Sequence, residues 1–202
     1  MGEMFRWAYA FDGDISNLDV SNVTYFVGMF SNATSFNQNI GSCNTSSATD
    51  LEGMFENATS FDKDIGTWDV SNVWSVSGMF AGATSFNQNI GGWDVSNVEV
   101  FRYTFVGASS FNQDIGNWDV SSAKTLYGMF KNASSFNFSI HAWNVSGVTD
   151  MRFLFQNANS FNQDIGSWDV SSVTDMGYMF MNVTSFNQDI GSWDVSNVVD
   201  ME

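Results

Sequence analysis

The chain has 202 residues, of which 44% are apolar and 16% aromatic, and its formal net charge is −16. This supply of core residues excludes general disorder, and no run of about 18 apolar residues is present to span a membrane. The acidic surface disfavours nucleic acid and anionic membranes as partners, which leaves cations, basic proteins and neutral sugars.

The dominant feature of the chain is a repeat with a fixed step of 25 residues and no insertion. Three columns keep this register, and they run from Phe5 to Phe180, from Phe11 to Phe186 and from Ile15 to Ile190. A period of about 20–50 residues is typical of solenoids, whose turns bury their apolar faces against one another. The sequence therefore predicts one repeat array over residues 1–202, with eight turns and stacked columns of Phe, Ile, Trp, Val and Met inside.

Within the unit at 161–180, the first predicted element is a short strand. Trp168 and Val170 alternate with Asp169, which is the period of a strand with one buried face, so a strand is expected within residues 163–170. From Val173 the apolar steps lengthen to three and four, through Met176 to Phe180, and this spacing predicts a short helix.

The ends of that segment carry the residues expected at helix ends. Ser172 with Asp175, and Ser47 with Asp50, are spaced like a capping box. After the predicted helix comes a column of Asn and Gly, the residues that best tolerate a left-handed C-cap: Asn32, Asn57, Gly82, Gly107, Asn132, Asn157 and Asn182. The predicted fold class is therefore an α/β repeat solenoid, leucine-rich-repeat-like, with a short strand and a short helix in each of eight turns. An all-β solenoid is the alternative if the segment from Val173 to Phe180 is extended.

The repeated string SFNQDIGSWDVSNV, followed by the element D-M-x-x-M-F, is present in full or nearly so at 85–98, 110–130, 160–180 and 185–201. It resembles the repeat of the BspA-like leucine-rich-repeat surface proteins, a family that includes mycoplasma-type surface lipoproteins, and the resemblance covers the whole chain. It implies a right-handed solenoid with a continuous sheet on one face, displayed at a cell surface and used for adhesion or interaction. It implies no catalytic activity.

The residues themselves also argue against an enzyme. Catalysis needs a unique set of side chains in a distinct environment, whereas the Ser, Asp and Asn residues of this chain stand in repeated columns. Cys43 replaces a Trp of its column and is interpreted as a core substitution, and His141 is a single change in a Gly column. The chain is predicted not to be an enzyme, and no cofactor other than calcium is expected.

Two acidic columns are candidate metal sites. Like charges on neighbouring turns repel, so each carboxylate must accept hydrogen bonds at its turn or share a cation such as calcium with its neighbours. Both explanations are open from the sequence. The candidate calcium ligands are Asp14, Asp64, Asp114, Asp164 and Asp189 in one column, and Asp19, Asp69, Asp94, Asp119, Asp169 and Asp194 in the other.

Glycosylation sequons form a further set of candidates. They begin at Asn22, Asn32, Asn44, Asn57, Asn132, Asn137, Asn144 and Asn182. A repeat rich in Asn, Ser and Thr also generates such triplets by chance, so the sequence alone leaves both interpretations open.

We predict a non-enzymatic extracellular repeat protein at a cell surface, which mediates adhesion or interaction with a protein or glycan. The alternative is a structural protein whose solenoids stack head to tail into fibres or a sheath, and a third is an acidic cation- or ice-binding surface. Adhesion predicts one face whose residues differ from turn to turn. Assembly predicts self-complementary ends, and neither end of the sequence carries a polar capping repeat. Residues 1–202 are therefore expected to be a segment of a longer array or a unit that associates head to tail.

Overall fold

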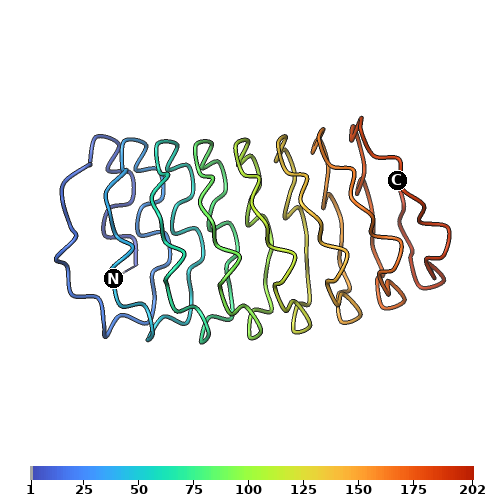
Figure 1. Ribbon diagram of the computed structural model, residues 1–202, viewed down its shortest axis with the longest axis horizontal. Coiled ribbons are helices and arrows are strands. Elements are labelled where there is room, and N and C mark those ends of the chain that lie inside the picture. The colour runs from blue at the N-terminus through green and yellow to red at the C-terminus, as the bar shows by residue number, and fades with distance from the viewer. Residues whose placement is uncertain (1) are drawn as a thin grey trace.

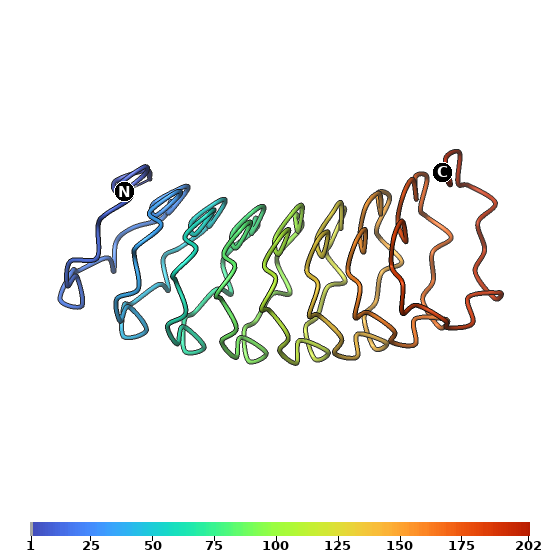
Figure 2. The ribbon, with the colours of Figure 1, turned by 90° about the horizontal axis from the view of Figure 1, so that it is seen from above.

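The computed structural model describes residues 2–202 and shows a stack of coils that lie side by side along the long axis of the molecule (Figures 1 and 2). Each coil is one 25-residue unit, so coil 1 is residues 1–25 and coil 8 is residues 176–200. We number positions within a coil from 1 to 25, which places the first Phe column at position 5. The N-terminal and C-terminal coils lie at opposite ends of the stack (Figure 1).

The predicted α/β solenoid is wrong, because residues 2–202 form neither a helix nor a strand. For the same reason this part of the chain contains no helix that could cross a membrane. Each coil is instead built from consecutive tight turns, so the leucine-rich-repeat-like fold and its continuous sheet are not present. The all-β alternative is not borne out either.

Backbone hydrogen bonds explain why the predicted helix does not form. In coil 2 the amides of Gly28, Phe30 and Asn32 donate across to coil 3, with N···O distances of 2.6–2.8 Å. The amides between them donate to the carbonyl three residues earlier, as Met29 does to Phe26 at 3.0 Å. A helix would need every amide to donate within its own segment, four residues back. Here every second amide connects two coils.

The left-handed column was predicted correctly, although it ends no helix. Asn32, Asn57, Gly82, Gly107, Asn132, Asn157 and Asn182 all have φ between 54° and 69°. Each is the third residue of a β-turn, as at Asn32, where the amide of Ala33 donates to the carbonyl of Phe30 at 2.9 Å. A positive φ at that position is the signature of a type II turn.

The predicted capping boxes are not helix caps. The carboxylate of Asp175 accepts the amide of Gly177 at 3.0 Å, and Asp50 accepts the amide of Glu52 at 2.9 Å. Ser47 instead donates its hydroxyl to the carbonyl of Ser21 in the preceding coil. These side chains stabilise turns and contacts between coils.

The predicted strand within 163–170 is also wrong, because that segment turns at Trp168, whose amide donates to the carbonyl of Ile165 at 3.1 Å. The alternation of burial was nevertheless correct, since Trp168 and Val170 are buried and Asp169 is exposed. Parallel pairing between coils is limited to isolated bridges at position 25, which link Tyr25, Asp50, Ser75, Val100, Thr125, Asp150, Asp175 and Asp200 in succession.

The predicted core columns are confirmed. Two Phe columns, at positions 5 and 11, stack face to face within each coil at centroid distances of 3.9–4.3 Å. The rings at position 5 also stack on those of the next coil at 5.5–5.9 Å. One hydrophobic cluster runs through the stack from Val20 to Met179. Offset stacking adds to the free energy gained from burial.

The Trp column at position 18 connects neighbouring coils. The indole N–H of each Trp donates to the Ile carbonyl of the preceding coil, as Trp118 does to Ile90 at 3.1 Å, and its ring stacks on Trp143 at 6.5 Å. Cys43 fills this position in coil 2, where it is half-buried and packs against the core, as the sequence predicted. Burial raises the pKa of the Cys43 thiol.

Candidate interaction surface

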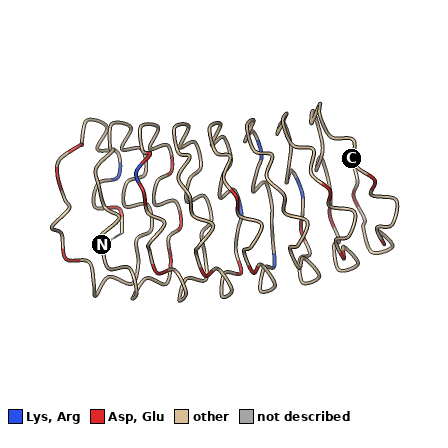
Figure 3. Cartoon of the chain, in the orientation of Figure 1, with Lys and Arg blue, Asp and Glu red and all other residues tan. Residues whose placement is uncertain are grey.

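The eleven predicted calcium ligands lie in exposed turns and accept hydrogen bonds there. In the first column, Asp64 accepts the amide of Gly66 at 2.9 Å, and its four counterparts accept in the same way. In the second column, Asp69 accepts hydrogen bonds from the Ser71 amide at 3.0 Å and from the Ser71 hydroxyl at 2.6 Å. The Ser71 hydroxyl, and then its amide, hold the pKa of Asp69 below its ordinary value. Acidic residues recur along the stack, while basic ones are few (Figure 3).

The calcium hypothesis stays a prediction. Among residues 2–202 no three or more His, Cys, Asp or Glu side chains gather in a group that could hold a metal ion. If calcium binds only the folded chain, millimolar calcium raises the melting temperature above that measured in chelator. An unchanged melting temperature would contradict calcium binding by these columns.

The sequon asparagines are exposed or, at Asn32, half-exposed. Several of their amides bond between coils, as Asn57 donates its Nδ2 to Oδ1 of Asn32 at 3.1 Å and Asn182 donates to Asn157 at 2.9 Å. Oδ1 of Asn137 accepts the backbone amide of Asn162 in the next coil at 2.9 Å. The asparagines therefore have a structural role, and glycosylation stays a prediction.

One surface differs from coil to coil, and we call it the variable face. It consists of positions 2, 3 and 6 of the coils. Position 2 holds Val27, Glu52, Ser77, Arg102, Tyr127, Arg152 and Gly177; position 3 holds Gly28, Gly53, Gly78, Tyr103, Gly128, Phe153 and Tyr178; position 6 holds Ser31, Glu56, Ala81, Val106, Lys131, Gln156 and Met181. Phe at positions 5 and 11 and Ile at position 15 do not vary at all.

The C-terminal half of the variable face is a row of aromatic rings. The ring of Tyr127 lies edge-on to Tyr103 at 4.9 Å and to Phe153 at 5.4 Å, and Phe153 stacks on Tyr178 at 5.4 Å. Burial, followed by the hydrogen bond with Tyr127, raises the pKa of Tyr103 to about 12. These contacts place positions 2 and 3 on one continuous surface.

Three of the six basic residues of the chain lie against this row. The guanidinium groups of Arg102 and Arg152 lie 4.8 and 4.9 Å from the ring centre of Tyr127. The ammonium group of Lys131 lies 4.7 Å from the ring centre of Phe153. Such cation–π contacts fix the directions of long side chains that would otherwise move freely.

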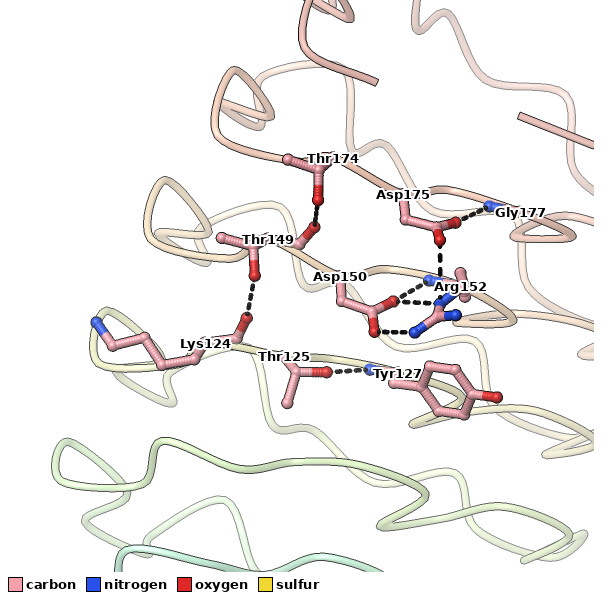
Figure 4. A network of polar contacts seen from close by, with 9 residues as sticks. All are labelled: Lys124, Thr125, Tyr127, Thr149, Asp150, Arg152, Thr174, Asp175 and Gly177. Atoms are coloured by element: carbon pink, nitrogen blue, oxygen red, sulfur yellow. Dashed lines mark hydrogen bonds and ion pairs between the residues drawn. The ribbon is translucent and has the colours of Figure 1, made fainter. Parts of the chain in front are cut away.

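Arg152 occupies a complete cation site on the surface (Figure 4). Its Nη2 donates to Oδ2 of Asp150 at 2.7 Å, and its Nε lies 3.3 Å from Oδ2 of Asp175. The hydrogen bond to Asp150 is the main cause that raises the pKa of Arg152. Two carboxylates and one face of Tyr127 thus surround a single guanidinium group.

The aromatic residues at position 3 are held in a strained backbone conformation. Tyr103, Phe153 and Tyr178 have φ of 55–58°, in the left-handed region, where four other coils have Gly at φ 59°. That region costs a non-glycine residue about 1–2 kcal/mol. Gly128 also lacks the Cβ that would lie 2.6 Å from the Tyr103 ring. Strain of this kind at an exposed or half-exposed position points to a role outside folding.

The middle of the variable face contains a shallow hollow of about 440 Å³. Every residue that lines it stands at position 2, 3 or 6 of coils 3–6, and the lining residues are Glu52, Gly53, Glu56, Ser77, Gly78, Ala81, Tyr103, Val106 and Lys131. Small residues in coils 3 and 4 form its floor. A second hollow, of about 690 Å³, lies over coil 8, where Phe180, Trp193 and Met201 line it.

The variable face was not predicted, because the spacing of apolar residues at positions 1 to 5 indicated a helix. A usable signal was present in the repeat itself. At position 3 the Gly residues of coils 2, 3, 4 and 6 alternate with Tyr and Phe, an exchange that conserves neither size nor conformational preference.

Comparison with known proteins gives a family and no further relatives. The family described as "Mycoplasma protein of unknown function, DUF285" matches residues 1–83, 60–147 and 129–202. This match fits the mycoplasma-type part of the resemblance noted in the repeat, but it does not confirm a BspA-like leucine-rich repeat. No curated protein and no solved structure matches the chain.

Proposed function

The chain belongs to the DUF285 family of Mycoplasma proteins of unknown function, and on this premise we propose that it is a non-catalytic recognition protein displayed at a cell surface. It binds a partner protein or glycan through the variable face, while the other columns supply the stack. The supporting observation is that residues on this surface differ from coil to coil, and that aromatic and charged residues replace Gly, Ser and Ala there.

The physical argument rests on what each residue does for the fold. The columns at positions 14 and 19 stabilise their own turns, and the Phe and Trp columns fill the core. Gly satisfies the backbone at position 3. The side chains of Tyr103 and Phe153 are therefore not required by the fold, and both residues carry backbone strain. Tyr and Arg, which both lie on this face, are among the residue types that contribute most to binding energy at protein interfaces.

The test compares the chain with a variant that carries Arg102→Ser, Tyr103→Gly and Phe153→Gly. We call it the levelled variant, because each substitution introduces the residue that other coils have at that position. Both proteins are applied to immobilised panels of extracellular-matrix proteins and cell-surface glycans. We expect binding to fall at least tenfold in the levelled variant. The control carries Phe138→Gln and His141→Gly, which also restore repeat residues but lie outside the variable face.

Equal binding by the levelled variant and the original chain would overturn the role of the variable face. Surface display is tested separately, by the accessibility of the chain to added protease on intact cells that express it. Head-to-tail assembly into fibres stays a prediction of the sequence.

A further inference from the structure

The hollow on the variable face has two carboxylates, those of Glu52 and Glu56, that form no ion pair with a Lys or Arg of residues 2–202. The only hydrogen bond that either carboxylate accepts in this part of the chain comes from the Ser31 hydroxyl, at 3.2 Å from Oε2 of Glu56. The Asp residues of the two acidic columns, by contrast, accept bonds from their own turns.

The rest of the lining contains one aromatic residue, Tyr103. Lys131 also lines the hollow, and its ammonium group lies 4.7 Å from the centre of the Phe153 ring. Gly53 and Gly78 carry no side chain that could fill the hollow. The lining therefore combines two carboxylates of coil 3 with a tyrosine of coil 5.

A similar group of two carboxylates and a tyrosine elsewhere on the molecule already binds a cation of the chain itself. Asp150, Asp175 and the ring of Tyr127 hold the guanidinium group of Arg152 on the same face. The hollow repeats this combination with Glu52 and Glu56 as the acids and Tyr103 as the ring. The difference is that the chain itself places Arg152 in the first set, whereas Ser77 and Ala81 leave the second open.

We propose that the hollow takes a lysine or arginine side chain of a partner protein. The cation pairs with Glu52 and Glu56, and its stem lies along Tyr103. The net charge of −16 favours this partner, because it raises the local concentration of basic segments and steers their approach. This inference rests on the proposed recognition role of the variable face and names the chemistry of its partner.

The experiment uses the full chain labelled with ¹⁵N and two synthetic peptides, Gly-Ser-Gly-Arg-Gly-Ser-Gly and its counterpart with citrulline in place of Arg. Citrulline has nearly the same shape without the charge. We expect saturable shifts of the amide signals of Gly53 and Gly78 with the arginine peptide, with a Kd on the order of 1 mM for a single cation. The citrulline peptide should bind at least tenfold more weakly.

Matched variants come from the repeat. Other coils already have Ser at position 2, as Ser77, and Gln at position 6, as Gln156. The substitutions Glu52→Ser and Glu56→Gln should therefore be accommodated by the coil. The double variant should weaken binding of the arginine peptide at least tenfold. Glu99→Gln, at an exposed carboxylate outside the hollow, should leave the Kd unchanged.

Failure to shift Gly53 and Gly78, equal binding of the citrulline peptide, or an unchanged Kd in the double variant would each overturn the proposal. None of these results decides the panel experiment, in which the levelled variant keeps both glutamates and loses Arg102 and Phe153, outside the hollow, together with Tyr103. The face can therefore bind a partner even if the hollow takes no basic side chain. Conversely, the arginine peptide can bind if the panel finds no partner.

Discussion

Two regions of each coil follow different rules. From position 8 to position 23, most side chains recur from coil to coil and serve the stack, as Asn112 does when its side-chain Oδ1 accepts the backbone amide of Asn137 at 3.0 Å. At positions 2, 3 and 6, side chains differ in size and charge, and at Tyr103 and Phe153 they oppose the local backbone preference. In a repeat protein, residues that the fold does not require are the ones available for recognition.

The largest effect is expected in the recurring region, in the Phe ladder. Phe80 is fully buried and stacks on Phe55, Phe86 and Phe105. Phe80→Ala should lower the free energy of unfolding by about 3–5 kcal/mol, measured by tryptophan fluorescence in urea. Phe138→Gln is the control, because Phe138 is exposed and other coils have Gln there. A loss below about 1 kcal/mol in Phe80→Ala would contradict a closely packed ladder.

A smaller loss is expected where the same region uses a polar contact. Trp118→Phe keeps most of the ring but leaves the buried carbonyl of Ile90 without its indole donor. The carbonyl of Ile90 keeps the amide of Trp93 as a donor at 3.1 Å, so the loss is that of one hydrogen bond, about 0.5–1.5 kcal/mol. Trp74→Phe is the matched control, since Trp74 is exposed. Equal urea midpoints for the two variants would show that the indole bond adds no stability.

The turn carboxylates predict a dependence of stability on pH. Hydrogen bonds from Ser hydroxyls and amides lower the folded-state pKa of Asp19, Asp69, Asp119, Asp169 and Asp194. Their contribution is therefore present above the unfolded pKa of about 3.9 and is lost as pH falls through the lower folded value. The melting temperature should stay level from pH 7 to 5 and fall below about pH 4.

Asparagine variants sharpen this test. Asn44 and Asn144 already accept the same Ser bonds with an amide oxygen. Replacing Asp69, Asp119 and Asp169 with Asn should therefore keep the turns and reduce the fall at low pH. A melting temperature that rises on acidification would show instead that repulsion between carboxylates outweighs their hydrogen bonds.

The smallest effect on stability is expected in the variable face. Phe153→Gly removes contacts with Tyr127, Tyr178 and Lys131 but also relieves about 1–2 kcal/mol of left-handed strain. The net change in unfolding free energy should lie within about 1 kcal/mol. The comparison is Phe155→Gly, two residues away, which should lose several kcal/mol because Phe155 is fully buried. A large loss of unfolding free energy in Phe153→Gly would show that the aromatic row stabilises the fold as core residues do.

The sequence by itself determined the 25-residue step, the buried columns and the left-handed Asn and Gly positions. These follow from residue type alone: an uninterrupted Phe column must be buried, and Gly or Asn tolerates positive φ. For residues 173–180 the sequence could not distinguish a helix from consecutive turns, because both structures place apolar residues three and four apart. Only the tertiary structure decided this, since amides there bond to neighbouring coils, as Thr174 does to Thr149 and Tyr178 does to Glu202. The tertiary structure also brought Glu52, Glu56 and Tyr103 around one hollow.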